Sequence, residues 1–107
     1  MDSKRRDGKT FKDLRVSEGI SKQEVANLVD YFLCKRYGQD EGAYMFSVVT
    51  LHQFENGHLY AKPHEEFALW EMLDFLIDHK DMPERELKMA CDRKYNLNRK
   101  EVYVERR

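Results

Sequence analysis

Histidine and cysteine are the residues of this chain that most often catalyse reactions or hold metals, and their spacing favours neither role. The four histidines do not recur at the i, i+4 spacing that places two zinc ligands on one helix face. Cys34 and Cys91 are far apart in the sequence, with no Cys-x-x-Cys pair, so we expect buried, reduced thiols. Gly-rich phosphate loops and Gly-x-Ser-x-Gly elbows are also missing. We therefore expect no enzyme, no metal and no cofactor.

Charged side chains offer a second kind of chemistry, the binding of phosphate groups. The 19 Lys and Arg residues nearly balance 20 Asp and Glu residues, for a net charge of −1, which by itself argues against a nucleic-acid partner. The charges are unevenly placed, however. Residues 1–29 carry seven basic and five acidic groups, residues 63–92 carry three and nine, and residues 93–107 carry six and two. The near-zero net charge of the chain thus conceals two basic ends and one acidic stretch.

The length and composition fit one small domain. The chain has 107 residues, of which 41% are hydrophobic and 36% charged, and domains typically contain about 100–150 residues. No run approaches the roughly 20 apolar residues of a transmembrane helix. The first residues are charged and lack the apolar segment of a signal peptide. We expect an intracellular protein, in the cytoplasm or nucleoid of a bacterium or phage, or in a eukaryotic nucleus.

Helical periodicity dominates the chain. Ser21, with Glu24 three residues later, predicts a capping box at a helix start. Ser47 predicts a second N-cap, and the β-branched residues after it leave a strand open as an alternative. The last ten residues fit a helix or a short strand, and we favour a helix. The expected helices span about 10–18, 21–35, 48–55 and 65–79, with a fifth that opens at 81–84.

Two of these helices have apolar residues that we assign to a core. In the first, Phe11, Leu14 and Val16 are expected to point inward. In the fourth, Phe67 is expected to begin the apolar stripe, and the acidic residues of the helix form its wet face. The segment 37–44, with Gly38 and a polar run, predicts a loop.

Two blocks of residues resemble the lambda-repressor-like helix-turn-helix fold, which includes Cro/repressor-type regulators and POU-specific domains. The first block runs from Lys9 to Val25 and contains Gly19-Ile20-Ser21. The second block, 46–57, is similar in frame to the third, recognition helix of that fold and ends in Glu55-Asn56-Gly57, with Pro63 following. The resemblance implies a compact all-α domain of four to five helices. Its connection between helix 2 and helix 3 is about ten residues longer than in the family's common forms.

The resemblance also implies roles for particular residues. Arg15 and Glu55 match an ion pair that ties the first helix to the third. Lys22 and Ser47 match phosphate-contacting positions, and the outward side chains of the recognition helix would meet bases in the major groove. The residues expected to contact DNA are Lys4, Arg5, Arg6, Lys22, Gln23, Ser47, Val48, Val49, Thr50, Gln53, His58 and Lys62.

The resemblance predicts a sequence-specific, double-stranded DNA-binding protein that regulates transcription. Residues 1–8 would be a flexible basic arm, 9–80 the helix-turn-helix domain, and 81–107 an extension that packs on the domain, forms a homodimer or holds a protein partner. The acidic stretch 63–92 would lie on the side away from DNA. The alternative is a protein-interaction module on the same fold that does not bind DNA.

Overall fold

The computed structural model describes residues 8–37, 46–59 and 61–97 of the chain, and all regular structure within them is helical. The all-α prediction is confirmed. The basic residues Lys4, Arg5 and Arg6, most of the enlarged connection and the ambiguous last ten residues lie outside the described part. The helices are α2 (Gly8–Ser17), α3 (Lys22–Arg36), α4 (Val48–Glu55), α5 (Pro63–Asp78) and α6 (Glu84–Tyr95).

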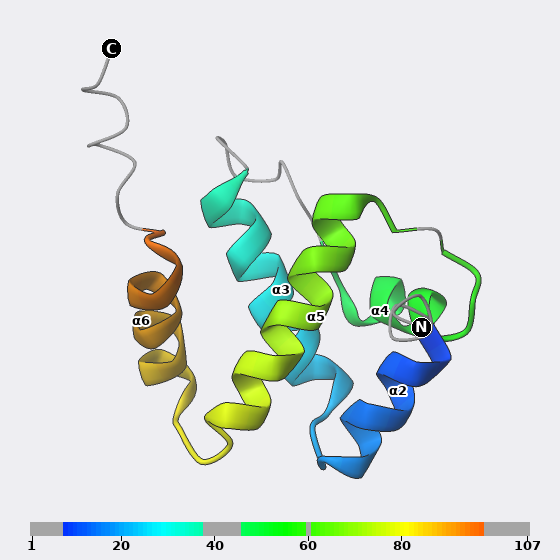
Figure 1. Ribbon diagram of the computed structural model, residues 1–107, viewed down its shortest axis with the longest axis horizontal. Coiled ribbons are helices and arrows are strands. Elements are labelled where there is room, and N and C mark those ends of the chain that lie inside the picture. Colours follow the sequence, from blue (N-terminus) through cyan, green and yellow to red (C-terminus); the bar gives the residue numbers. More distant parts are fainter. Residues whose placement is uncertain (1–7, 38–45, 60, 98–107) are drawn as a thin grey trace.

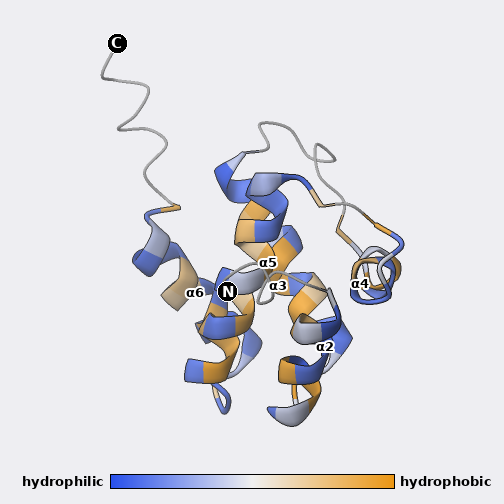
Figure 2. Ribbon diagram, turned by 45° about the vertical axis from the view of Figure 1, so that its right-hand side comes forward, coloured by the Kyte–Doolittle hydropathy of each residue, from blue (hydrophilic) through white to orange (hydrophobic). Residues whose placement is uncertain are grey.

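A central pair of helices organises the molecule. α3 packs along α5, and it also contacts α4 and α6. α2 and α4 lie on one side of this pair and α6 lies on the other (Figure 1). Figure 2 shows hydrophobic and hydrophilic residues alternating along the helices, as expected of helices that bury one face each. The apolar faces meet between the helices.

The predicted caps fix where two of the helices begin. The Ser21 hydroxyl accepts a hydrogen bond from the Glu24 amide at 3.1 Å, and the Glu24 carboxylate accepts one from the Ser21 amide at 2.9 Å. At α4, the Ser47 hydroxyl accepts from the amide of Thr50. Gly19 lies between α2 and α3 at φ +72°, a backbone conformation that side chains with a Cβ disfavour. The tight α2–α3 turn thus depends on this glycine.

Two helix starts differ from the prediction. α5 begins at Pro63 instead of 65, because proline suits the first helical position and the Glu65 carboxylate accepts from the Lys62 amide at 2.9 Å. α2 begins at Gly8, which was assigned to the flexible arm. Gly8 is buried, and a Cβ at this position would overlap the carbonyl oxygen of Phe54. The close approach of α2 to α4 explains why glycine stands there.

The core gathers apolar residues from all five helices. Phe11 is fully buried, and its ring lies edge-on to Phe54 of α4 at 5.5 Å and to Trp70 of α5 at 5.0 Å, measured between ring centroids. This one side chain therefore joins three helices. Other fully or almost fully buried core residues are Val25, Val29, Phe32, Leu33, Leu51, Leu69, Met72, Leu73, Phe75 and Cys91.

Two residues predicted to face the core are exposed. Val16 is 58% exposed because it follows buried Arg15, and successive helical residues point about 100° apart. Phe67 is 45% exposed. It lies on the same side of α5 as Glu71 and Asp74, at i, i+4 and i+7, and so begins the polar face of that helix. Both assignments to the core were wrong.

α6 packs onto the domain through a few buried residues and two hydrogen bonds. Leu87, Cys91 and, just after the helix, Leu97 are buried. The Tyr31 hydroxyl of α3 donates to Asp92 at 2.6 Å, and the Tyr95 hydroxyl donates to Glu71 of α5 at 2.8 Å. Burial, together with the adjacent carboxylates, raises the pKa of both phenols above the ordinary value. The segment after residue 80 thus packs on the domain in its described part.

The two cysteines should differ sharply in reactivity. Burial, with a further contribution from Asp92, raises the pKa of the Cys91 thiol from 9.0 to about 12. Below that pH the native protein keeps Cys91 protonated and shielded, whereas Cys34 is only half-buried. At pH 8 we expect iodoacetamide to modify Cys34 first and Cys91 only as fast as the protein opens, as measured by peptide mass spectrometry. Equal labelling rates in native conditions would contradict this packing.

The raised pKa of Cys91 also predicts how stability depends on pH. The unfolded thiol loses its proton near pH 9.0, whereas the folded one keeps it to about 12. The unfolded state therefore binds fewer protons between these values, and the free energy of unfolding falls as the pH rises through this window. Cys91→Ala would be expected to weaken this alkaline dependence while also leaving a small cavity.

Candidate nucleic-acid interface

The solvent-facing side of α4 carries two of the predicted binding residues, Val49 and Gln53. Val49, His52, Gln53 and Asn56 are all exposed, and their i, i+3, i+4, i+7 spacing places them on one face. Val49 is 64% exposed. We call these four residues the outer face of α4.

A buried ion pair holds α4 against α2. The guanidinium of Arg15 and the carboxylate of Glu55 form a two-pronged contact, Nε to Oε2 at 2.7 Å and NH2 to Oε1 at 2.9 Å. The remaining guanidinium nitrogen of Arg15, NH1, donates to the carbonyl oxygen of Ile20 in the α2–α3 turn at 2.9 Å. The Arg15 and Glu55 side chains are 7% and 0% exposed. The expected pair is therefore present, and it fixes α4 relative to α2 and the turn.

A polar contact joins the start of α3 to the outer face of α4. Lys22 Nζ lies 3.0 Å from His52 Nδ1, and because an ammonium can only donate, Nδ1 is the acceptor in this arrangement. The side-chain amide of Asn56 donates to the His52 carbonyl oxygen at 2.9 Å. Lys22 thus places its ammonium group beside the outer face of α4. His52 was not among the predicted residues, although its spacing from Val49 and Gln53 places it on the same face of the helix.

The recognition-helix residues are placed partly as predicted. Val49 and Gln53 point outward, and Ser47 is exposed at the N-cap. Val48 was expected to point outward but is half-buried against the core. Its position, three residues before buried Leu51, puts it on the inner face of α4, so the prediction for Val48 was wrong. Thr50 is half-buried as well, and its hydroxyl lies 3.2 Å from that of Ser47.

The remaining predicted residues are exposed outside α4. The Gln23 side chain donates to Asn27 at 2.8 Å along α3. His58 follows α4, and its amide donates to the carbonyl oxygen of Gln53 at 2.8 Å. Lys62 precedes α5. These contacts do not join the side chains of Gln23, His58 and Lys62 to Lys22 or to the outer face of α4.

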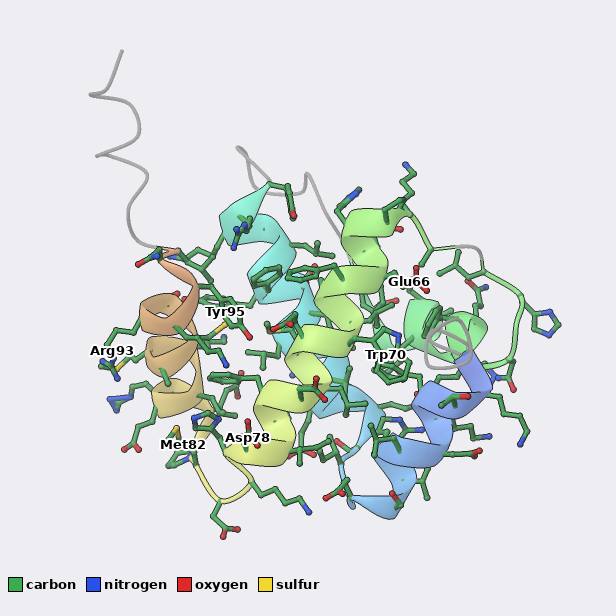
Figure 3. The ribbon with its side chains drawn as sticks, viewed as in Figure 1. Glu66, Trp70, Asp78, Met82, Arg93 and Tyr95 are labelled. Carbon is green, nitrogen blue, oxygen red and sulfur yellow. The ribbon has the colours of Figure 1, made fainter. Side chains whose placement is uncertain are left out.

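The electrostatics of α4 suit an anionic ligand. Glu55 is the one acidic residue of this helix, and Arg15 neutralises it in the interior. Two acidic groups of the stretch 63–92 lie away from α4: Glu71 accepts from Tyr95 on the α6 side of the molecule, and Asp74 is exposed on α5. Glu66 lies on the α4 side of α5 (Figure 3). The outer face of α4 itself carries no carboxylate.

Comparisons of the chain with protein-family models, with curated proteins and with solved structures find no match. Two further observations bear on the class of site. Within residues 8–37, 46–59 and 61–97, no three His, Cys, Asp or Glu side chains form a group that could hold a metal. None of the helices described there is long and apolar enough to cross a membrane.

Proposed function

We propose that this protein binds double-stranded DNA in a sequence-dependent way and regulates transcription, with α4 as the helix that enters the major groove. The observation that supports this most is the outer face of α4, with Val49 and Gln53 exposed on a helix that a buried ion pair fixes to α2. A helix that reads bases needs a fixed orientation and side chains free to contact base edges. The outer face of α4 also carries no carboxylate that would repel a DNA phosphate.

Four residues of the proposed interface have a chemical partner on DNA. The methyl groups of Val49 can pack on the C5-methyl of thymine, and the amide of Gln53 can pair with N6 and N7 of adenine. Ser47 and Lys22, at the starts of α4 and α3, can contact backbone phosphates. These contacts favour sites that contain A·T pairs. A homodimer would read two half-sites about one helical turn apart.

A selection from random duplexes tests the proposal. The wild-type protein should enrich a shared sequence, and Gln53→Ala should weaken binding to it by about 5–150-fold, the cost of about 1–3 kcal/mol for one lost base pairing. Lys22→Ala should weaken binding to all duplexes and lower the salt slope by about 1. Arg85→Ala removes a cation on α6, across the molecule from α4, and serves as the control that leaves DNA binding unchanged.

Two results would overturn this function. One is the absence of any enriched sequence together with no mobility shift at low salt. The other is equal binding by wild type, Gln53→Ala and Lys22→Ala. Association with a protein that does not weaken with salt would then favour the protein-interaction alternative, because phosphate binding always depends on salt.

A further inference from the structure

The outward side of α6 combines two cations with an exposed apolar residue. Arg85, Met89 and Arg93 recur every four residues, so they form one stripe about 12 Å long. Met89 is 53% exposed. Beside it lies an open hollow of about 610 Å³, lined in part by Met82 and Ala90. Figure 3 shows Arg93 pointing away from the helices, whereas Tyr95 points toward them. We call Arg85, Met89 and Arg93 the α6 stripe.

Four of the other charged residues of α6 interact within the protein, whereas Glu86 and the two arginines of the stripe do not in the described part of the chain. Glu86 is exposed and also lines the hollow, where the two arginines outnumber it. Lys88 lies 3.4 Å from Glu84 and 5.1 Å from the centre of the Tyr31 ring. Asp92 accepts the Tyr31 hydroxyl, and Lys94 lies over the Tyr95 ring. In the described part of the chain, no hydrogen bond, ion pair or ring contact involves Arg85 or Arg93. These cations are available to an external ligand.

We propose that the α6 stripe binds an acidic segment of a partner protein, with a large apolar side chain of that segment seated beside Met89. Arginine and methionine are enriched at protein interfaces, and methionine adapts to varied apolar shapes. Two arginines that flank an apolar centre complement a helix with carboxylates on either side of an apolar anchor. Nucleic acid is a poorer fit, since a phosphate backbone has no group to cover Met89.

A second copy of this chain does not fit the stripe. In an antiparallel pairing of two α6 helices centred on Met89, Arg85 of each copy would face Arg93 of the other. Like charges placed directly opposite each other disfavour such a dimer. The partner is therefore a different, acidic protein.

The stripe and the outer face of α4 lie on opposite sides of the α3–α5 pair (Figure 1). A segment bound at α6 would leave α4 uncovered. This proposal does not depend on the proposed DNA binding, and either can fail while the other holds.

The test uses the full chain and a fluorescent amphipathic peptide of about 16 residues, long enough to form a helix, with leucines on one face and glutamates flanking them. Fluorescence anisotropy should show saturable binding of this peptide and none of a version with glutamine in place of glutamate. Arg85→Glu/Arg93→Glu should weaken peptide binding by about tenfold or more, as expected from losing two ion pairs and adding repulsion. Met89→Ser should weaken it as well, while circular dichroism stays unchanged.

Lys9→Glu/Lys12→Glu is the matched control, because it changes the charge equally on α2, and neither lysine belongs to the α6 stripe or to the proposed DNA contacts. It should leave peptide binding intact. The proposal would be overturned by the absence of peptide binding by wild type, by an equal loss in the control, or by displacement of the peptide by duplex DNA. Self-association in sedimentation that Arg85→Glu/Arg93→Glu abolishes would also overturn it in favour of a second copy.

Discussion

Glu55→Ala is expected to lower the free energy of unfolding by about 3–5 kcal/mol, the usual cost of removing one member of a buried ion pair. The substitution removes both acceptors of the Arg15 fork at 2.7 and 2.9 Å, while the guanidinium stays almost fully buried. The hydrogen bond that remains, to the Ile20 carbonyl oxygen, satisfies only one nitrogen of the guanidinium. Urea denaturation followed by circular dichroism would measure the loss.

Two variants separate the buried charge from a general effect of losing a glutamate. Glu86→Ala removes an exposed carboxylate from α6 and should change stability by about 0.5 kcal/mol or less. Arg15→Met/Glu55→Leu replaces both charges by apolar groups and should recover much of the loss, because no unpaired charge remains. A loss below about 1 kcal/mol for Glu55→Ala would show that the pair is open to water. An unchanged loss in the double variant would show that the carboxylate matters for another reason.

Local signals in the sequence were enough to predict the helices. Ser21 with Glu24, and Ser47 alone, mark helix starts through hydrogen bonds that span only three residues, and both caps are present. Of the two misplaced helix starts, that of α5 follows from the local signals of Pro63 and Glu65, whereas that of α2 depends on a distant contact. Gly8 joins α2 because the helix approaches the backbone of α4, and no signal near Gly8 in the sequence shows that approach.

Side-chain direction was harder to predict where a helix is apolar on more than one side. Phe67 and Val48 are hydrophobic, so their types alone do not distinguish a core position from an exposed one. The angle at which each helix packs decides it, and that angle leaves Phe67 exposed and turns Val48 inward. For Val48, the spacing to Leu51 and Glu55 carried the information, because those two residues face the interior.

The candidate site was also predictable only in part, because its contacts join residues that lie far apart in the sequence. The pairing of Arg15 with Glu55 came from a resemblance, since the two residues stand 40 positions apart. The contact between Lys22 and His52 joins α3 to α4 over 30 positions of the sequence, and only the packed helices place these side chains together. The α6 stripe, in contrast, is a four-residue repeat of Arg85, Met89 and Arg93 that the sequence already contains. The stripe becomes significant only when the structure shows that another side of α6 is buried and that the stripe faces outward.

Phe11→Ala is expected to destabilise the protein by about 3–5 kcal/mol, the range for truncating a buried phenylalanine. Phe11 is fully buried, and its ring contacts Phe54 of α4 and Trp70 of α5, so the cavity would lie where three helices meet. α4 would lose part of the surface that sets its orientation. Because the chain has one tryptophan, the fluorescence of Trp70 reports directly on this part of the core.

Phe67→Ala removes the same atoms from an exposed position and is the matched control for this effect. Its ring is 45% exposed and meets Phe32 only at 6.4 Å between centroids, so we expect a loss of about 1 kcal/mol or less. Phe11→Leu keeps much of the buried volume and should lose less than Phe11→Ala. Equal losses for Phe11→Ala and Phe67→Ala, or unchanged Trp70 fluorescence in Phe11→Ala, would contradict the central place of Phe11. A large loss confined to Phe11→Ala would show that one aromatic ring of α2 holds α4 and α5 together, since the two variants delete identical groups and differ only in burial.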